Sequence, residues 1–330
     1  MAELFECHDK KKFELIAFSF GPDKQDQWRK RALLCFDQFV DVRLKSDREI
    51  SLLARKMEID IAIDLKGFTQ DCRTNIFAEG SAPIQVSYLG YPGTMVADYM
   101  DYLIADRTLI PEEKQLHYSE KIVYMPNSYQ VNVSKRSVSE ASLLRHELGL
   151  PNTGFIFCCF NNNYKITPSV FTGWMRILKA VEDSVLWLFS NYDNTTSTKN
   201  LKKEAIKFGI NEDRLIFAKY VPAEEHLNRI KQADLFIDTL PYNAHTTTSD
   251  ALRMGLPVLT LEGNSFNSRE AASVISALNL PELITTTEEE YESLAIELAT
   301  HPEKLKIIKD KLVSNLSTAP LYNTKLFTKN

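Results

Sequence analysis

Residue types suited to binding phosphate and sugar are concentrated in residues 238–250, which read Asp-Thr-Leu-Pro-Tyr-Asn-Ala-His-Thr-Thr-Thr-Ser-Asp. The apolar run before them, at 234–238, predicts a buried strand, and residues 249–255 predict a helix closed by a glycine. We therefore expect His245, Thr246 and Thr247 to lie in the turn between that strand and the helix. Backbone N–H groups and the helix dipole make such a turn receptive to phosphate.

Asp250 follows Thr246 by four residues, so we expect it one helical turn further along the same face. A carboxylate there can accept hydrogen bonds from sugar hydroxyls. The alternative is an ordinary helix cap formed by a Ser or Thr side chain, with Asp250 only complementing the helix dipole. The spacing alone leaves both interpretations open.

Two other predicted strand-to-helix turns carry polar side chains. Lys165 follows the apolar strand predicted at 154–160, and His226 and Arg229 lie in the helix that follows the strand predicted at 214–218. Parallel strands end at one edge of a sheet, so these groups would converge with residues 245–250 into a site for a nucleoside diphosphate. Each one taken alone is more often an ordinary surface side chain, and only their joint placement favours a binding site. We expect no bound metal, because no His, Cys or carboxylate pair has metal-ligand spacing.

The elements that must position these residues alternate between strand and helix along the whole chain. That pattern predicts an α/β fold of parallel sheets covered on both faces, in two doubly wound, Rossmann-like halves. The polar segment 130–140 is the expected boundary, giving a half at 1–135 and a half at 136–330. The first half opens in the middle of a strand–helix unit, so we expect it to lack an opening strand. The long charged helix predicted at 288–315 has a possible break at Pro302.

Composition excludes several classes of protein. The 330 residues are 44% hydrophobic and 25% charged, with a net charge of -5, which argues against a general nucleic-acid binder. There is no apolar run of transmembrane length and no signal peptide at the start, so we expect no membrane association. The five cysteines are scattered and odd in number, which indicates reduced packing residues and a cytoplasmic protein.

Several stretches carry a resemblance to a known family. They are 82–94 (Ala-Pro-Ile-Gln-Val-Ser-Tyr-Leu-Gly-Tyr-Pro-Gly-Thr), 118–121, 160–166 (Phe-Asn-Asn-Asn-Tyr-Lys-Ile), 184–188, 222–226, 238–250 and 320–325. Together they resemble the C-terminal catalytic region of the O-linked N-acetylglucosamine transferases (the SPINDLY and O-GlcNAc transferase group), in the same order and over essentially the whole chain. The chain is similar to the compact bacterial form, without the large insertion of animal members and without the N-terminal tetratricopeptide repeats.

The resemblance implies a GT-B fold, in which two Rossmann-like domains face a cleft, and a metal-independent, inverting transfer of N-acetylglucosamine. The donor would be UDP-GlcNAc or a related UDP- or GDP-sugar, and the acceptor a Ser or Thr of a protein. No cofactor is implied. The first half would serve the acceptor side and the second half the donor.

The resemblance also assigns roles to individual residues. Lys165 would bind the diphosphate and stabilise the leaving group, with Asn162 replacing a glutamine of the animal proteins beside it. Asp250 would contact the ribose. The remaining implied contacts are His226 on the uracil with Arg229 at its edge, His245, Thr246 and Thr247 on the phosphates, and Gly90, Pro92, Gly93 and Thr94 on the acceptor side.

Two departures from the family pattern bear on activity. Ala223 stands where animal members have a lysine near the ribose, and the family's opening strand, with a histidine loop at the reaction centre, has no counterpart here. His8 and Asp64 are the candidates for a general base, with a loop residue and a structural carboxylate as the alternative interpretations. Two other functions stay open, a module or fragment that binds UDP-sugar without transfer and a UDP-sugar epimerase.

Overall fold

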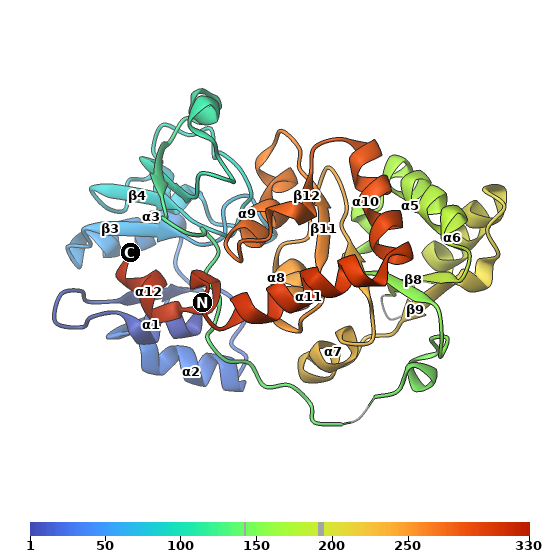
Figure 1. Cartoon of the computed structure of the whole chain (residues 1–330). Helices are drawn as coiled ribbons and strands as arrows, with labels where there is room; N and C mark the ends of the chain where they lie inside the picture. The colour runs from blue at the N-terminus through green and yellow to red at the C-terminus, as the bar shows by residue number, and fades with distance from the viewer. Residues whose placement is uncertain (142, 191–194) are drawn as a thin grey trace. The chain divides into compact units, whose positions relative to one another are not determined.

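The structure is a computed structural model that describes residues 1–141, 143–190 and 195–330 (Figure 1). The chain divides into two compact units. Unit 1 comprises residues 1–135 together with 320–330, and unit 2 comprises residues 136–319. Each unit is built on parallel strands connected by helices, so the predicted α/β class is confirmed.

Unit 2 is organised around one six-stranded parallel sheet with the order β12-β11-β10-β7-β8-β9. In chain order this is the 3-2-1-4-5-6 arrangement of a Rossmann fold, in which the strand order reverses between the first strand, β7, and the fourth, β10. Both strands are buried because helices cover the two faces of the sheet. The strands are β7 (Phe155–Cys159), β8 (Ser184–Phe189), β9 (Leu215–Ala218), β10 (Leu235–Ile237), β11 (Val258–Leu261) and β12 (Ile284–Thr285).

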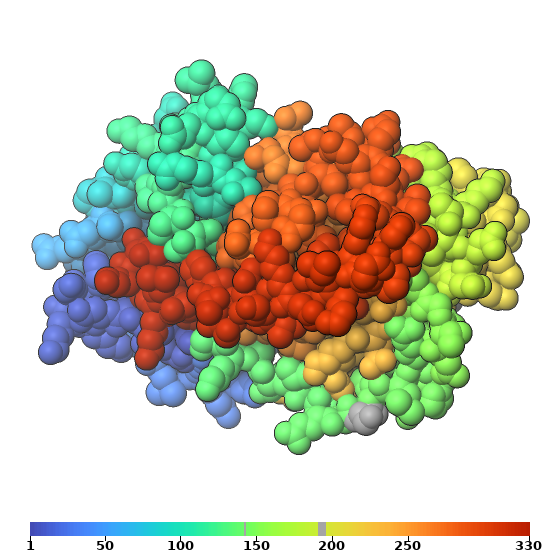
Figure 2. All heavy atoms as spheres, in the orientation of Figure 1, coloured from blue at the N-terminus to red at the C-terminus, as the bar shows by residue number. Residues whose placement is uncertain are grey.

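The helices of unit 2 start where the sequence supplies caps. Thr167 caps α5 through its hydroxyl, which accepts from the Val170 N–H, and Pro168 occupies the first turn. The predicted helix at 288–315 is two helices that meet at Pro302. Figure 2 shows the orange and red atoms of this C-terminal part of unit 2 closely packed on its surface. The helices are α5 (Pro168–Ala180), α6 (Thr195–Lys207), α7 (Ala223–Ile230), α8 (Thr246–Arg253), α9 (Glu270–Ser276), α10 (Glu288–Thr300) and α11 (Pro302–Leu316).

Unit 1 contains two separate parallel ladders. β1 pairs with β2, and β3, β4, β5 and β6 pair in that order. The strands are β1 (Ile16–Ser19), β2 (Gln38–Asp41), β3 (Ile61–Asp64), β4 (Ile84–Ser87), β5 (Tyr102–Ala105) and β6 (Lys121–Tyr124). The helices are α1 (Ala2–Cys7), α2 (Gln27–Cys35), α3 (Asp47–Lys56), α4 (Asn75–Ala78) and α12 (Thr324–Lys329).

The core of unit 1 lies beneath α3. Ser46 and Glu49 form a reciprocal capping box at the start of this helix. Ile50 of α3 is fully buried against Val42 and Ile76, and Phe18 of β1 packs on the same cluster. Because α3 also connects β2 to β3, it ties the two ladders of unit 1 to one core.

The last eleven residues belong to unit 1, whereas the sequence analysis grouped them with the second half. α12 packs against α1, and the Thr324 hydroxyl donates to the Asn132 carbonyl at 2.7 Å. Contacts between residues 192 positions apart leave no local sequence signal, so the return of the chain could not be anticipated. Within the described residues, no helix has both the length and the apolar character needed to cross a membrane.

Candidate functional site

Lys165 lies at the point where the strand order of unit 2 reverses. It belongs to the loop between β7 and α5, and its Nζ donates to the carbonyl of Asn243, in the loop after β10, at 2.7 Å. The same Nζ lies 3.7 Å from the centroid of the Tyr242 ring. One ammonium group thus bridges the two loops that flank the crevice where Rossmann sheets bind ligands.

The partly buried surroundings of Lys165 strengthen the attraction of its ammonium group for an anion. Partial burial lowers the pKa of the ammonium group, while Glu270 and Asp238 act in the opposite direction. A cation withdrawn from water attracts an anion more strongly than a solvated one does. The loop is therefore suited to holding a phosphate group.

Asp238, at the end of β10, is the centre of a buried hydrogen-bond network. Its Oδ1 accepts from the backbone N–H groups of Thr239 and Ala244, both at 2.7 Å, and its Oδ2 accepts from the Thr260 hydroxyl at 2.8 Å. The Asn161 amide donates to Oδ1 at 3.1 Å. Burial raises the pKa of Asp238 to about 6, although these donors and Lys165 favour the ionised form. This carboxylate fixes the loop that leads into α8.

The N-terminus of α8 begins three residues earlier than predicted. His245 occupies the cap position and Thr246 is the first helical residue, so the threonines line the first turn of the helix instead of the preceding loop. Thr246 is exposed, whereas the Thr247 hydroxyl donates to Asn161 Oδ1 at 2.7 Å. Burial and the nearby Lys165 lower the pKa of His245 to about 4, so its ring is neutral at neutral pH.

His226 and Arg229 form a second part of the site, on α7. The Arg229 Nε donates to His226 Nδ1 at 3.1 Å, which leaves the proton of the neutral ring on Nε2. The His226 ring meets the ring of Phe160 edge to face at 5.1 Å between centroids. Burial, with Arg229 and Arg136, lowers the pKa of His226 to about 4, and burial lowers that of Arg229 to about 10.

Asp250 pairs with an arginine that sequence reasoning missed. Arg136, at the start of unit 2, donates to Asp250 Oδ1 and forms an ion pair with it. Burial raises the pKa of Asp250, and Arg136 acts against that shift. Because Arg136 also influences His226, it connects the α7 part of the site with α8. The interpretation of Asp250 as a carboxylate that only complements the dipole does not account for this partner.

Of the remaining predicted residues of unit 2, Asn162 is exposed in the loop that carries Lys165, and Ala223 is the first residue of α7. Sequence reasoning missed Asn161, Asp238 and Tyr242 as well as Arg136. Asn161 and Asp238 each lie directly after an apolar strand, within the stretches 160–166 and 238–250 that carry the family resemblance.

The residues predicted in unit 1 form a tight turn after β4. A Cβ on Gly90 would lie 2.1 Å from the Leu65 carbonyl oxygen, so only glycine fits this approach. Pro92 and Gly93 continue the turn. The Thr94 hydroxyl donates to the buried Glu120 at 2.6 Å, which ties the end of the turn to the segment before β6.

The two candidates for a general base are also in unit 1. Asp64 ends β3 and is 7% exposed, and its Oδ1 accepts from the N–H groups of Lys66 and Gly67 at 2.8 and 3.0 Å. Within the described residues its Oδ2 has no hydrogen-bond partner. His8 follows α1, and its Nδ1 lies 2.8 Å from the Leu4 carbonyl oxygen, an arrangement that fits a structural residue.

Comparison with known proteins matches this arrangement to one family. The model of glycosyl transferase family 41 matches residues 1–139 and 136–330. The chain belongs to glycosyl transferase family 41. It is 34% identical, over its full length, to the probable UDP-N-acetylglucosamine–peptide N-acetylglucosaminyltransferase SEC of Arabidopsis thaliana, of which it covers 34%.

Solved structures agree with the family assignment. The chain is similar to a variant of the Thermobaculum terrenum O-GlcNAc transferase, with a TM-score of 0.88 and 28% identity over 99% of this chain and 62% of the other. A protein from Listeria monocytogenes that is assigned as a UDP-N-acetylglucosamine 2-epimerase shares the fold, with a TM-score of 0.52 and 14% identity over 100% of this chain and 90% of the other. The two Rossmann-like units of this family 41 chain are those of a GT-B fold, which confirms the predicted fold.

Proposed function

We propose that this chain is the catalytic region of a glycosyltransferase that moves N-acetylglucosamine from UDP-GlcNAc to Ser or Thr hydroxyls of proteins. The observation that carries the proposal is the place of Lys165, whose ammonium group bridges the loops after β7 and β10 beside the N-terminus of α8. Membership of family 41 and the names of the relatives support the donor and the acceptor class.

Unit 2 would bind the donor. The diphosphate would lie between Lys165, Asn162 and the first turn of α8, where His245, Thr246 and Thr247 offer backbone and side-chain donors. The flat, neutral ring of His226 would stack on the uracil, with Arg229 at its edge. Asp250 would accept hydrogen bonds from the ribose hydroxyls. Because Arg136 already donates to Asp250 Oδ1, the carboxylate would serve both partners at once.

The chemistry we propose is a single displacement with inversion. As the bond to UDP breaks, the sugar takes on oxocarbenium character and negative charge develops on the departing diphosphate. The Lys165 ammonium and the N–H groups of α8 would stabilise that charge, which is the work a divalent cation performs in other transferases. The reaction would therefore proceed without a metal.

The acceptor side is assigned to unit 1, with Gly90, Pro92, Gly93 and Thr94 lining it and Asp64 as the candidate base. The chain spans 34% of the Arabidopsis relative, so recognition of particular acceptor proteins belongs to this proposal as well. The protein would act in the cytoplasm.

Isothermal titration calorimetry with UDP, followed by transfer of radiolabelled GlcNAc to a protein mixture, tests the proposal. We expect Lys165→Met to weaken UDP binding at least about tenfold, because it removes a charge-assisted contact, and to lower transfer by about 10²–10³-fold. Lys179→Met, at an exposed position of α5, is the matched control and should change neither. Excess EDTA should leave transfer unchanged, and a β-specific hexosaminidase should release the sugar.

Each alternative function predicts a different result. Binding of UDP without transfer would replace the proposal by a UDP-sugar-binding module. Interconversion of free sugar nucleotides would favour an epimerase, with which the chain shares its fold. Unchanged UDP affinity in Lys165→Met would refute the site itself.

A further inference from the structure

Residues 136–141 form no helix or strand, but two hydrogen bonds hold them against α7. The Ser139 N–H donates to the Glu224 carbonyl at 3.2 Å, and the Asn228 amide donates to the Ala141 carbonyl at 2.6 Å. Asn228 is itself buried. The start of unit 2 is therefore fixed beside the helix that carries the proposed uracil contacts, and so is the arginine at its first position.

From this segment Arg136 reaches the carboxylate of Asp250 on α8. Its Nη1 donates to Asp250 Oδ1, and the two side chains, 28% and 13% exposed, form an ion pair. Burial and Arg229 lower the pKa of His226 on α7, and the charge of Arg136 adds to that shift. The guanidinium group thus lies near both residues that the proposed function assigns to the nucleoside.

The ion pair leaves one oxygen of the Asp250 carboxylate open. Among the residues that the structure describes, Oδ2 accepts no hydrogen bond, whereas Oδ1 is held by Arg136. A carboxylate has about four acceptor sites, so Oδ2 can serve a second donor while Oδ1 stays bound. Burial raises the pKa of Asp250 and Arg136 opposes that shift, so the pair favours the charged form that accepts most strongly.

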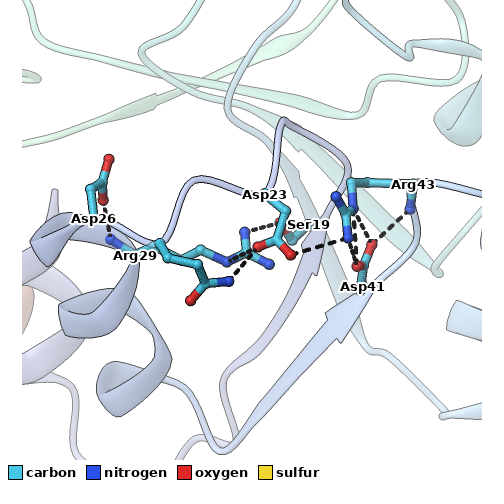
Figure 3. A network of polar contacts seen from close by, with 7 residues as sticks. Ser19, Asp23, Asp26, Arg29, Asp41 and Arg43 are labelled. Atoms are coloured by element: carbon cyan, nitrogen blue, oxygen red, sulfur yellow. Dashed lines mark hydrogen bonds and ion pairs between the residues drawn. The ribbon is translucent and has the colours of Figure 1, made fainter.

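The ion-pair network at the ends of β1 and β2 is different, because both oxygens of its carboxylates are engaged (Figure 3). Asp41 accepts from Arg43 on Oδ1 at 3.0 Å and on Oδ2 at 2.6 Å. Asp23 pairs through Oδ1 with Arg29 at 2.9 Å and through Oδ2 with Arg43 at 3.4 Å. Such pairs tie loops together within the protein. The open oxygen of Asp250 distinguishes its pair from this structural kind.

We propose that Arg136 makes the donor site select ribonucleotides, an inference that rests on the proposed function of unit 2. Arg136 is a positioning residue, because it holds Oδ1 of Asp250 while Oδ2 accepts from the ribose hydroxyls. A nucleotide without these hydroxyls loses the bonds to a partly buried carboxylate and leaves Oδ2 without a partner. The selectivity therefore depends on the Arg136–Asp250 pair as a unit.

Calorimetric titration of the full chain with UDP and with 2′,3′-dideoxy-UDP tests the proposal. We expect the unmodified chain to bind UDP at least about tenfold more tightly, because hydrogen bonds to a charged group are the strong ones. Arg136→Met should reduce that ratio at least about fivefold, mainly by weakening UDP. A general loss of stability weakens both ligands alike and does not move the ratio.

Arg145→Met is the matched control. Arg145 pairs with Asp234, which directly precedes β10, and the two side chains are 23% and 21% exposed. The variant thus removes a similar pair from the same unit at the amino end of a strand, away from the proposed donor site. It should leave the ratio of the two affinities unchanged.

The outcomes separate this inference from the proposed function. An unchanged ratio in Arg136→Met would overturn the inference and leave the donor site in place, as would equal affinity of the unmodified chain for the two ligands. Tighter UDP binding by Arg136→Met would also overturn it, because Arg136 would then block Asp250 instead of positioning it. Absence of UDP binding by the unmodified chain would overturn the proposed function together with the inference.

An Asp250→Asn background keeps the test decisive if Arg136→Met alone does not fold, because it leaves no carboxylate unpaired. In that background Arg136→Met should change the ratio by less than about twofold, since a positioning residue has no effect without the group it positions. A larger change would show that Arg136 acts independently of Asp250 and overturn the proposal.

Discussion

The ammonium group of Lys165 is held by an aromatic ring and a carbonyl oxygen, and no carboxylate of the described residues forms an ion pair with it. Its Nζ lies over Tyr242 and donates to Asn243, and the Tyr242 carbonyl in turn accepts from Thr239 at 2.6 Å. A ring attracts the cation without neutralising it. The charge therefore stays available to an anionic ligand, which makes Tyr242 a positioning residue for Lys165.

Substitutions of Tyr242 test that role. Tyr242→Phe keeps the ring and should retain UDP affinity within about twofold, whereas Tyr242→Leu should weaken it about five- to thirtyfold, the equivalent of 1–2 kcal/mol. Calorimetric titration with UDP measures both. If Phe and Leu had equal effects, the hydroxyl or the shape of the loop would be responsible, and the ring would have no role in holding the cation.

The two partly buried histidines, His226 and His245, should make unit 2 sensitive to acid. The pKa values of His226 and His245 are both lowered to about 4, below the unfolded value of about 6.5. The unfolded chain therefore takes up protons first, and the stability present above pH 6.5 is lost as the pH falls towards 4. The pKa of Asp238 is raised to about 6, so its contribution to stability grows as the pH falls. That contribution offsets roughly the loss caused by one histidine.

Urea unfolding of His226→Gln at about pH 7 and about pH 5 measures this sensitivity. The variant should lose less stability between the two pH values than the unmodified chain. The contributions of the remaining His245 and of Asp238 to the pH dependence then nearly cancel. His146→Gln, at an exposed position, is the control and should keep the original pH dependence. The same loss in His226→Gln would contradict the lowered pKa of His226.

The sequence predicted the positions of the polar residues better than their partners. Lys165, His226 and His245 each follow an apolar strand, which is why the sequence predicts them at one sheet edge. In the structure burial and the nearby Lys165 lower the pKa of His245, and the ring of His226 packs against Phe160. Arg136 and Asp250 are separated by 114 positions, and Asn161 and Asp238 by 77. Such pairs depend on how strands are ordered in the sheet, which no local pattern encodes.

Among the elements, the turn after β4 shows how closely backbone segments approach in unit 1. A Cβ on Gly90 would meet the backbone of Leu65 and Lys66 at 2.1 and 2.7 Å, and backbone atoms cannot rotate away as a side chain can. Gly90→Ala should therefore destabilise unit 1 by about 1–3 kcal/mol. Gly93 lies in the same turn, but a Cβ on it would be 3.5 Å from its nearest atom, Tyr91 Cε1, which is an ordinary contact distance. Gly93→Ala should therefore be tolerated. Thermal unfolding followed by circular dichroism compares the two, and an equal loss in both would contradict the close approach.

For the molecule as a whole, the separate cores of the two units imply that a donor ligand stabilises one of them. Trp174 and Trp187 are fully buried in unit 2, whereas Trp28 is exposed in unit 1. In a Trp28→Phe variant, tryptophan fluorescence therefore reports the unfolding of unit 2 alone. UDP at about 100 times its Kd should raise the free energy of unfolding of unit 2 by about 2.7 kcal/mol.

Hydrogen exchange in β5 supplies the matching measurement for unit 1, because Leu103 there is fully buried. Its exchange should be unaffected by UDP, since the predicted donor contacts all belong to unit 2. An equal increase in stability in both units would mean that they unfold as one cooperative body. If UDP did not stabilise unit 2, the donor site would not lie in unit 2. A gain in unit 2 alone would show that donor binding depends on the six-stranded sheet of unit 2 and not on the fold of unit 1.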